Sequence, residues 1–180
     1  MKYLIISDIH GSYHYLQDVL ANELYDKLLL LGDILPHGPR NDLPLGYEPK
    51  KVMTMLNSLK DKIICVRGNC DAAVDDMVLA FPILEMAVIV EEGISYYLTH
   101  GHQYHPDNLL AVNNSVVLYG HTHISKIEKI GTNIYINPGS ISIPKDGYNS
   151  YATLENGKLI IKDYRQNPIK EIDIKKELYE

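Results

Sequence analysis

Potential metal ligands follow the first two buried strands that the sequence predicts, at the point where each strand ends. Asp8 and His10 stand one residue apart after an apolar run at residues 3–6, and Asp33 follows four consecutive leucines. Carboxylate and imidazole donors together suit Mn, Fe, Zn or Co rather than a soft metal ion. Asp8 could instead cap the next helix, but Ser12 can take that role. These residues therefore predict part of a site for divalent metal ions.

The same arrangement recurs at three later strand ends. Asn69 follows an apolar run at residues 63–66, and its amide oxygen can bind a hard cation without adding charge. His100 ends a second run, and His121 and His123 follow a third, with Gly120 allowing a sharp turn between them and the strand. Alternate residues can project the same way, so both imidazoles could face one point. Two solvent-exposed loop histidines are the simpler reading of that pair alone, but the recurrence favours a shared site.

The number of these ligands suits two divalent ions that share one carboxylate. Two ions about 3.5–4 Å apart can activate a water and stabilise the oxygens of an in-line displacement at phosphorus. The sequence thus indicates hydrolysis of a phosphate ester. The candidate ligands are Asp8, His10, Asp33, Asn69, His100, His121 and His123.

Four other residues are weaker candidates for substrate contact. The proline-rich loop at residues 34–49 carries His37 and Arg40, and the planar guanidinium of Arg40 could pair with phosphate oxygens. Both side chains could equally brace the loop. Cys70 is expected to be a neutral thiol near the site, because the surrounding donors favour hard or borderline ions. His102 is a candidate only because it is near His100 in the sequence.

The elements that position these residues follow from the apolar pattern. A strand, helix, strand order with short links predicts parallel neighbours, which puts Asp8, His10 and Asp33 at one sheet edge. Asp71 could cap a short helix or hold a ligand from behind. The polar loop at 137–142 could offer backbone N–H groups to the site, although a structural turn is the simpler reading. Strands are expected at 2–7, 27–31, 62–66, 82–90, 94–99, 116–119, 125–130, 133–136, 151–154 and 158–164, and helices at 13–24, from Pro49 to Leu59, near 72–77 and near Pro106.

Composition limits the remaining possibilities. The 180 residues are expected to form a single domain spanning 1–180. The net charge of −6 argues against a surface that coats nucleic acid. Two cysteines without framework spacing fit a reducing cytoplasm, and no apolar run reaches membrane-spanning length. The tail at 168–180 is expected to be an edge strand or a short helix.

The ordered motifs resemble those of the calcineurin-like metallophosphoesterase superfamily, and particularly its small bacterial phosphodiesterases of the YfcE type. The likeness covers nearly the whole chain and includes residues 37–41 and 137–140. It implies an α/β fold of two stacked mixed β-sheets flanked by helices, a four-layer α/β/β/α sandwich. The motifs that carry it are Asp8-x-His10, Gly32-Asp33, Gly68-Asn69-x-Asp71, Thr99-His100-Gly101-His102 and Gly120-His121-Thr122-His123.

The resemblance also implies roles for the ligands. Two divalent ions are expected, manganese first, with Fe, Zn, Ni or Co as alternatives. Asp33 would bridge the two ions, and Asp33, Asn69 and His100 would be the catalytic residues. One ion would be held by Asp8, His10, Asp33 and His123, and the other by Asp33, Asn69, His100 and His121.

One departure concerns the leaving group. Many superfamily members carry a histidine directly after the asparagine, where this chain has Cys70. A histidine acid is therefore absent at that place, and His102 is a possible substitute. For some leaving groups no acid is needed.

The implied activity is phosphodiester hydrolysis by a water or hydroxide that the two ions activate. One alternative is a phosphomonoesterase, including a protein phosphatase, and another is a non-enzymatic scaffold similar to the retromer subunit vacuolar protein sorting 29. The expected partner is a small phosphodiester, with nucleic acid only as a possible substrate and no membrane. The sheet edges of the fold would allow a homodimer.

Overall fold

β1 (Lys2–Ile6) lies inside a seven-stranded sheet, and both of its faces are covered. Leu4 and Ile6 pack toward the helices, whereas Tyr3 and Ile5 pack toward a second sheet. A strand covered on both faces needs no polar alternation, which explains the unbroken apolar run. β2 (Lys27–Leu30) and β3 (Ile63–Val66) continue the sheet parallel to β1, as the sequence predicts.

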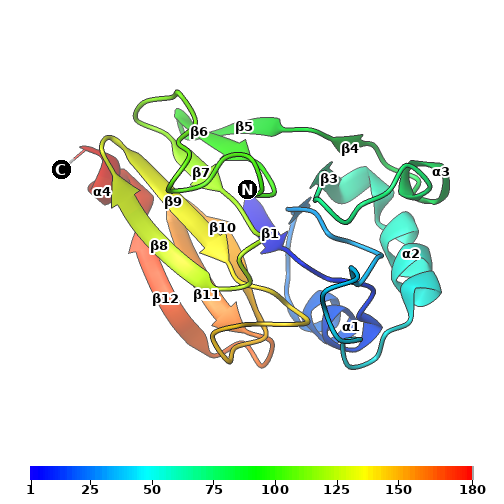
Figure 1. Ribbon diagram of the computed structural model, residues 1–180. Helices are drawn as coiled ribbons and strands as arrows, with labels where there is room; N and C mark the ends of the chain where they lie inside the picture. Colours follow the sequence, from blue (N-terminus) through cyan, green and yellow to red (C-terminus); the bar gives the residue numbers. More distant parts are fainter. Residues whose placement is uncertain (180) are drawn as a thin grey trace.

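Residues 1–179 are described by the computed structural model, and their strands form two sheets (Figure 1). The larger sheet has the order β12 (Pro168–Asp173), β11 (Lys158–Asp163), β10 (Ser150–Glu155), β1, β2, β3 and β4 (Ile83–Leu84). The smaller has the order β5 (Ala87–Glu91), β6 (Ile94–Leu98), β7 (Val116–Leu118), β9 (Asn133–Pro138) and β8 (Ser125–Ile130). Both mix parallel and antiparallel pairs, so the expected class of two mixed sheets with helices is confirmed.

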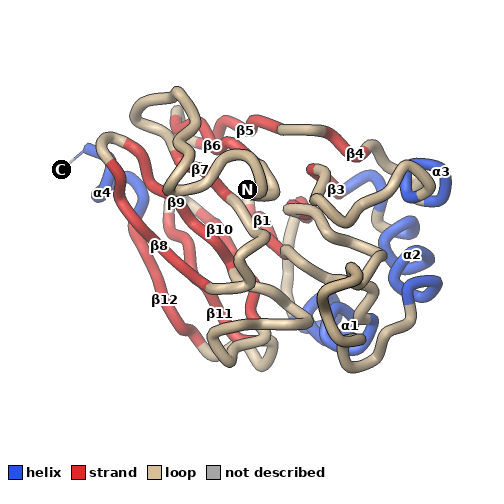
Figure 2. The backbone as a smooth tube through the Cα atoms, viewed as in Figure 1, coloured by secondary structure: helices blue, strands red, loops and turns tan. Residues whose placement is uncertain are grey.

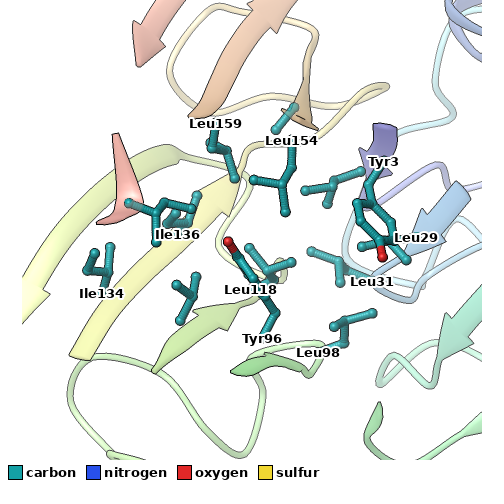
Figure 3. Close-up of a cluster of buried hydrophobic side chains, with 14 of the residues drawn as sticks. Tyr3, Leu29, Leu31, Tyr96, Leu98, Leu118, Ile134, Ile136, Leu154 and Leu159 are labelled. Atoms are coloured by element: carbon teal, nitrogen blue, oxygen red, sulfur yellow. The ribbon is translucent and has the colours of Figure 1, made fainter. Parts of the chain in front are cut away.

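The two sheets pack face to face around the main hydrophobic core (Figure 3). Leu29 and Leu31 from the larger sheet meet Leu98, Leu118 and Ile136 from the smaller one. Every one of these side chains is fully buried. The strands that precede the candidate ligands contribute side chains to this core from both sheets. The core therefore fixes the loops after β1 and β2 relative to the loops after β6 and β7.

α1 (Tyr13–Asn22) and α2 (Pro49–Ser58) pack on the outer face of the larger sheet, whereas the outer face of the smaller sheet is covered by an irregular segment. Leu110 and Val112, from the irregular segment 99–115, pack on Val117 and Tyr135 at the outer face of the smaller sheet. This segment has too few apolar residues at helical spacing to form the expected helix near Pro106. Figure 2 shows it as loop. The helices are α1 (Tyr13–Asn22), α2 (Pro49–Ser58), α3 (Asp75–Val78), the short 3₁₀ helix Lys60–Lys62 and α4 (Ile174–Tyr179).

Three regions differ most from the sequence prediction. Helix α1 ends at Asn22, and Leu24, expected on its buried stripe, is 83% exposed. The expected strand at 82–90 is two strands, β4 paired with β3 and β5 paired with β6, because the chain crosses from one sheet to the other here. The tail forms both an edge strand, β12, and α4, which contacts β9 and β12.

Within the described part of the chain, no helix combines the length and the apolar character that a bilayer span requires.

Candidate metal centre

The loops that follow β1, β2 and β7 hold their functional residues in an unusual backbone conformation. Asp8, His10, Asp33, His121 and His123 have φ angles of 55°, 46°, 55°, 68° and 58°. Residues other than glycine rarely adopt this left-handed region, and each instance costs on the order of 1–3 kcal/mol. Such a backbone conformation persists only where the surrounding structure holds it in place. Here it occurs at five of the expected ligands.

Asp8 lies at the centre of a first cluster of ligands. Nε2 of His123 lies 3.2 Å from Oδ1 of Asp8, and Nε2 of His10 lies 3.7 Å from the same oxygen. The two imidazole nitrogens are 3.4 Å apart. The three side chains are buried and could bind one ion together.

Asp33 lies between this cluster and a second one. Its Oδ2 is 3.6 Å from Nε2 of His10 and 3.4 Å from Nε2 of His100. Nε2 of His100 also lies 3.0 Å from Oδ1 of Asn69. Asp8, Asp33 and His100 form a further group of atoms close enough to share an ion. One carboxylate is thus in reach of both clusters, as a bridging ligand must be.

His121 and His123 do not converge on one point, contrary to the expectation from their spacing. His123 faces Asp8 and His10, whereas the ring of His121 lies 5.2 Å from that of His100, centroid to centroid. Their positive φ angles break the extended geometry on which the expectation rested. The separation places one histidine beside each cluster.

The second nitrogen of each buried imidazole is bound to the backbone. Nδ1 of His10, His100 and His123 lies 2.8, 2.7 and 2.9 Å from the carbonyl oxygens of Pro36, Leu31 and Ile143. A carbonyl only accepts, so each Nδ1 carries the proton and donates. In the neutral ring the lone pair of Nε2 then points at the carboxylates, which is the tautomer a metal ligand needs.

Burial and neighbouring charges both shift the pKa values of these groups. Burial alone would raise the pKa of Asp8, but contacts with His10 and His123 outweigh it and hold that pKa below its usual range. Burial would lower the pKa of His100, but the carboxylates of Asp33 and Asp8 raise it to about 9. The pKa of His121 is lowered by burial and by the neighbouring His100.

The residues fit divalent cations on their own chemistry. Oδ1 of Asp8 is buried and accepts no hydrogen bond from any described residue. With neutral imidazoles, this oxygen faces the lone pairs of two nitrogens, and only a cation satisfies all three. The amide oxygen of Asn69 and the imidazoles of His100 and His121, near Asp33, complete a mixed oxygen and nitrogen set.

Two glycines allow the loops to approach the ligands. A Cβ at Gly120 would lie 1.8 Å from Oγ of Ser7, and one at Gly68 would lie 2.1 Å from Oδ1 of Asp33. Gly120 does not have a positive φ, so close packing rather than the expected sharp turn explains it. The contact lets the backbone N–H of His121 donate to Oδ2 of Asp8 at 3.0 Å.

Asp71 holds two of the ligand loops together. Its carboxylate accepts hydrogen bonds from the backbone N–H groups of Asp33, Ile34 and Gly68 at 2.8–2.9 Å. Of the two roles that the sequence allowed, the structure shows contact behind the ligands, because the cap position of α3 is Val74 and no side-chain hydrogen bond is made there. Ser12 likewise makes no capping bond to α1, because its hydroxyl donates to the carbonyl of Leu45.

The sequence analysis missed the hydroxyl groups that support Asp8. Ser140 and Ser142 both donate to the backbone carbonyl of Asp8, at 2.9 and 2.8 Å. The 137–142 loop therefore contacts Asp8 through side-chain hydroxyls and not through the backbone N–H groups that the sequence allowed beside a simple structural turn. Asn137 donates to the carbonyl of Gly120 at 2.7 Å and so holds the histidine turn. The family likeness drew attention to residues 137–140, but no pattern in the sequence indicated these roles.

A cavity of about 800 Å³ opens at the clusters and receives some of the expected substrate contacts. Arg40 and Cys70 line it, and so does Lys145, which the sequence analysis did not single out. Burial and the carboxylate of Asp33 raise the pKa of Cys70 to about 12, consistent with the expected neutral thiol.

The other two expected substrate contacts lie elsewhere. The ring of His37 packs edge-on against Tyr47 with centroids 5.5 Å apart, and His37 is not among the residues that line the cavity. His102 is exposed, with its ring 5.5 Å from that of His100. Burial and the charge of His100 lower the pKa of His102. His37 thus braces its loop, and His102 stands beside the cluster.

A family model supports what the geometry indicates. The model of a calcineurin-like phosphoesterase superfamily domain matches residues 1–158. The chain belongs to the calcineurin-like phosphoesterase superfamily. The family implies divalent metal ions, and the clusters around Asp8 and Asp33 offer candidate ligands for them.

Comparison with individual proteins shows which members of the superfamily this chain is similar to. The chain is 48% identical over 170 residues to phosphodiesterase YfcE of Escherichia coli K12, covering 89% of this chain and 91% of that protein. The solved structure of YfcE, a phosphoesterase from E. coli, matches with a TM-score of 0.93 at 45% identity, over 97% of this chain and 100% of that one. Vacuolar protein sorting 29 from Cryptosporidium parvum matches with a TM-score of 0.62 at 18% identity, over 95% and 97% of the chains, and shows the fold alone.

Proposed function

We propose that this protein is a phosphodiesterase that works with two divalent metal ions, manganese being the first to test. The position of Asp33 carries the proposal, because its Oδ2 lies between Nε2 of His10 and Nε2 of His100 at 3.6 and 3.4 Å. The identity of 48% to a phosphodiesterase supports the choice of a diester substrate.

The chemistry divides between the ions and the chain. When bound, such ions activate water and polarise the oxygens of a phosphoryl group. The chain's part is to hold the ligands in fixed positions before the substrate arrives, which lowers the cost of reorganisation during the reaction. Arg40, on the cavity wall, can donate to a phosphoryl oxygen that the cluster leaves free.

The leaving group receives little help from side chains. Burial and the neighbouring His100 lower the pKa of His102, which disfavours the protonated imidazole that a general acid needs. The thiol of Cys70, with a pKa of about 12, is weaker still. We therefore expect the protein to prefer esters whose leaving group departs as a stable anion, such as p-nitrophenolate.

Hydrolysis of bis-p-nitrophenyl phosphate beside p-nitrophenyl phosphate tests the proposal. Protein stripped with EDTA is assayed before and after manganese is restored. Turnover of the diester only with metal is the expected result. Preference for the monoester would favour a phosphomonoesterase, and inactivity toward both with metal bound would contradict the proposal.

The scaffold alternative is not favoured. A scaffold that has lost catalysis is expected to carry damaged ligand positions, yet all seven positions here hold competent donors. The likeness to vacuolar protein sorting 29 is a likeness of fold.

A further inference from the structure

A second cavity, of about 290 Å³, lies next to the one that opens at the metal centre. Thr122 and Ile124 line both cavities. They flank His123 in the chain, so the boundary between the two cavities lies at the histidine turn itself. A phosphoryl group at the ligand clusters would therefore have space on each side.

The outer face of β8 forms one wall of the second cavity. Lys126, Glu128 and Ile130 alternate along this strand, and all three line the cavity. Side chains two apart on a strand share a face, so this wall is set by the pleat and not by a mobile loop. Pro106 and His105 come from the segment that covers this sheet in place of a helix.

The two cavities differ in chemistry. The larger has Arg40 and Lys145 on its walls, and it suits a group rich in oxygen atoms or negative charge. The smaller combines the apolar side chains of Ile124 and Ile130 with a charged pair, Lys126 and Glu128, whose charged atoms are 2.6 Å apart. Ile124 is 45% exposed at the boundary, where an organic group could cover it.

On the basis of the proposed function, we propose that the substrate is a linear phosphodiester with a sizeable organic group on each ester oxygen, one group in each cavity. In a linear diester the two groups diverge from phosphorus, as the two cavities diverge from the histidine turn. A cyclic diester carries both ester oxygens on one ring and would leave one cavity empty. The second cavity thus selects against cyclic diesters and against diesters with one small arm.

Two diesters with the same leaving group test this selection. Bis-p-nitrophenyl phosphate carries a second aryl arm, and methyl p-nitrophenyl phosphate carries only a methyl group. The ratio of their kcat/KM values is compared between the manganese-loaded wild type and variants, because the intrinsic reactivity of each ester then cancels. Lys126→Trp fills the second cavity from an exposed strand position, and Lys126 is not one of the candidate metal ligands.

A matched control distinguishes the effect of filling the second cavity from the effect of placing a tryptophan on the protein surface. Lys158→Trp alters another exposed strand lysine paired to a glutamate, and the side chains of Lys126 and Lys158 are 50% and 52% exposed. Lys126→Trp is expected to lower the diaryl-to-methyl ratio by about 10-fold, the discrimination typical of a filled apolar subsite. Lys158→Trp is expected to keep the wild-type ratio. Glu128→Trp fills the same cavity and replaces Lys126→Trp if that variant does not fold.

The outcomes distinguish this inference from the function on which it rests. If the wild type turns over both esters and the ratio is unchanged or raised in the filled variants, the two-arm inference is wrong and the phosphodiesterase stands. If the metal-loaded wild type hydrolyses neither ester, the proposed function fails, and the inference fails with it.

Discussion

Nε2 of His123 lies 3.2 Å from Oδ1 of Asp8, an oxygen that accepts no hydrogen bond among the described residues. The Nδ1 proton of the same ring is committed to the carbonyl of Ile143. A buried carboxylate oxygen facing an imidazole lone pair is unfavourable unless a proton or a cation lies between them. This contact gives the proposed binding of metal its most direct structural basis.

Asp8→Asn is expected to remove the stabilisation by the manganese ion of the first cluster without destabilising the metal-free protein. The Asn oxygen can keep the bonds from Ser7 and from the N–H of His121, and its amide can donate to His123. A ligand at 100 times its Kd stabilises the folded state by about 2.7 kcal/mol, a gain that the variant should lose. Thermal unfolding with and without manganese measures both effects. A full manganese shift in Asp8→Asn would show that this carboxylate binds no ion.

Asp71→Ala is expected to weaken metal binding by about 10- to 100-fold, as other losses of support behind metal ligands do. Three backbone N–H groups near Asp33 and Gly68 would lose their acceptor. The manganese concentration for half-maximal activity should rise, with recovery at saturating metal. Asp76→Ala, which breaks an exposed pair with Arg67, is the control. An unchanged metal requirement in Asp71→Ala would assign that residue a purely structural role.

Tyr96→Phe is expected to stabilise the protein by roughly 1 kcal/mol. Tyr96 is fully buried between the sheets, and its hydroxyl has no hydrogen-bond partner among residues 1–179 (Figure 3). Removing a buried unsatisfied group relieves a desolvation cost of about 1–3 kcal/mol. Tyr151→Phe is the opposite case, because that hydroxyl donates to Glu23 at 2.7 Å, and it should destabilise. Chemical denaturation measures both, and a loss of stability in Tyr96→Phe would point to an unseen partner for the hydroxyl.

Glu23 is expected to contribute stability that acid removes. Burial would raise the pKa of its carboxyl, but hydrogen bonds from Lys162 at 2.6 Å and from Tyr151 outweigh it and lower the pKa. A carboxyl with a lowered pKa stabilises the fold fully above its unfolded pKa of about 4.3 and loses this contribution as pH falls through the folded value.

Melting temperatures of wild type and Glu23→Gln between pH 3 and pH 7 measure that contribution. The wild type should melt higher at pH 7, and the gap should close below about pH 4. Other acid-sensitive groups are common to both proteins and cancel. Glu171→Gln, at an exposed pair with Lys158, should show little difference at any pH. A gap that widens in acid would contradict the account of Glu23.

The gathering of the candidate ligands at one site could be predicted because its signal is local. Each expected ligand directly follows an apolar run, and a run buried on both faces is readable from the sequence without knowing what covers it. The strands that carry Asp8 and Asp33 are neighbours through a strand, helix, strand unit, so even their shared edge follows from chain order. The conformation of the loops does not, and the positive φ of His121 and His123 overturned the expected convergence.

The rest depends on contacts between segments far apart in the chain. The apolar stretch at residues 82–90 contributes a strand to each sheet, and its pattern does not show where the chain crosses from β4 to β5. Ser140 and Ser142 reach Asp8 across more than 130 residues, and Lys145 reaches the cavity in the same way. No spacing rule connects such residues. The layer over the smaller sheet also depends on such contacts, because the segment at residues 99–115 packs there.

If Asp33 joins two ions, as proposed, the number of manganese ions bound per chain should depend on this residue. Equilibrium dialysis of wild type and Asp33→Ala, with thermal unfolding to show that both are folded, gives this number. We expect two ions in the wild type, and at most one in Asp33→Ala with diester hydrolysis lost. A wild type that binds one ion, or an Asp33→Ala variant that binds two and stays active, would contradict this proposal.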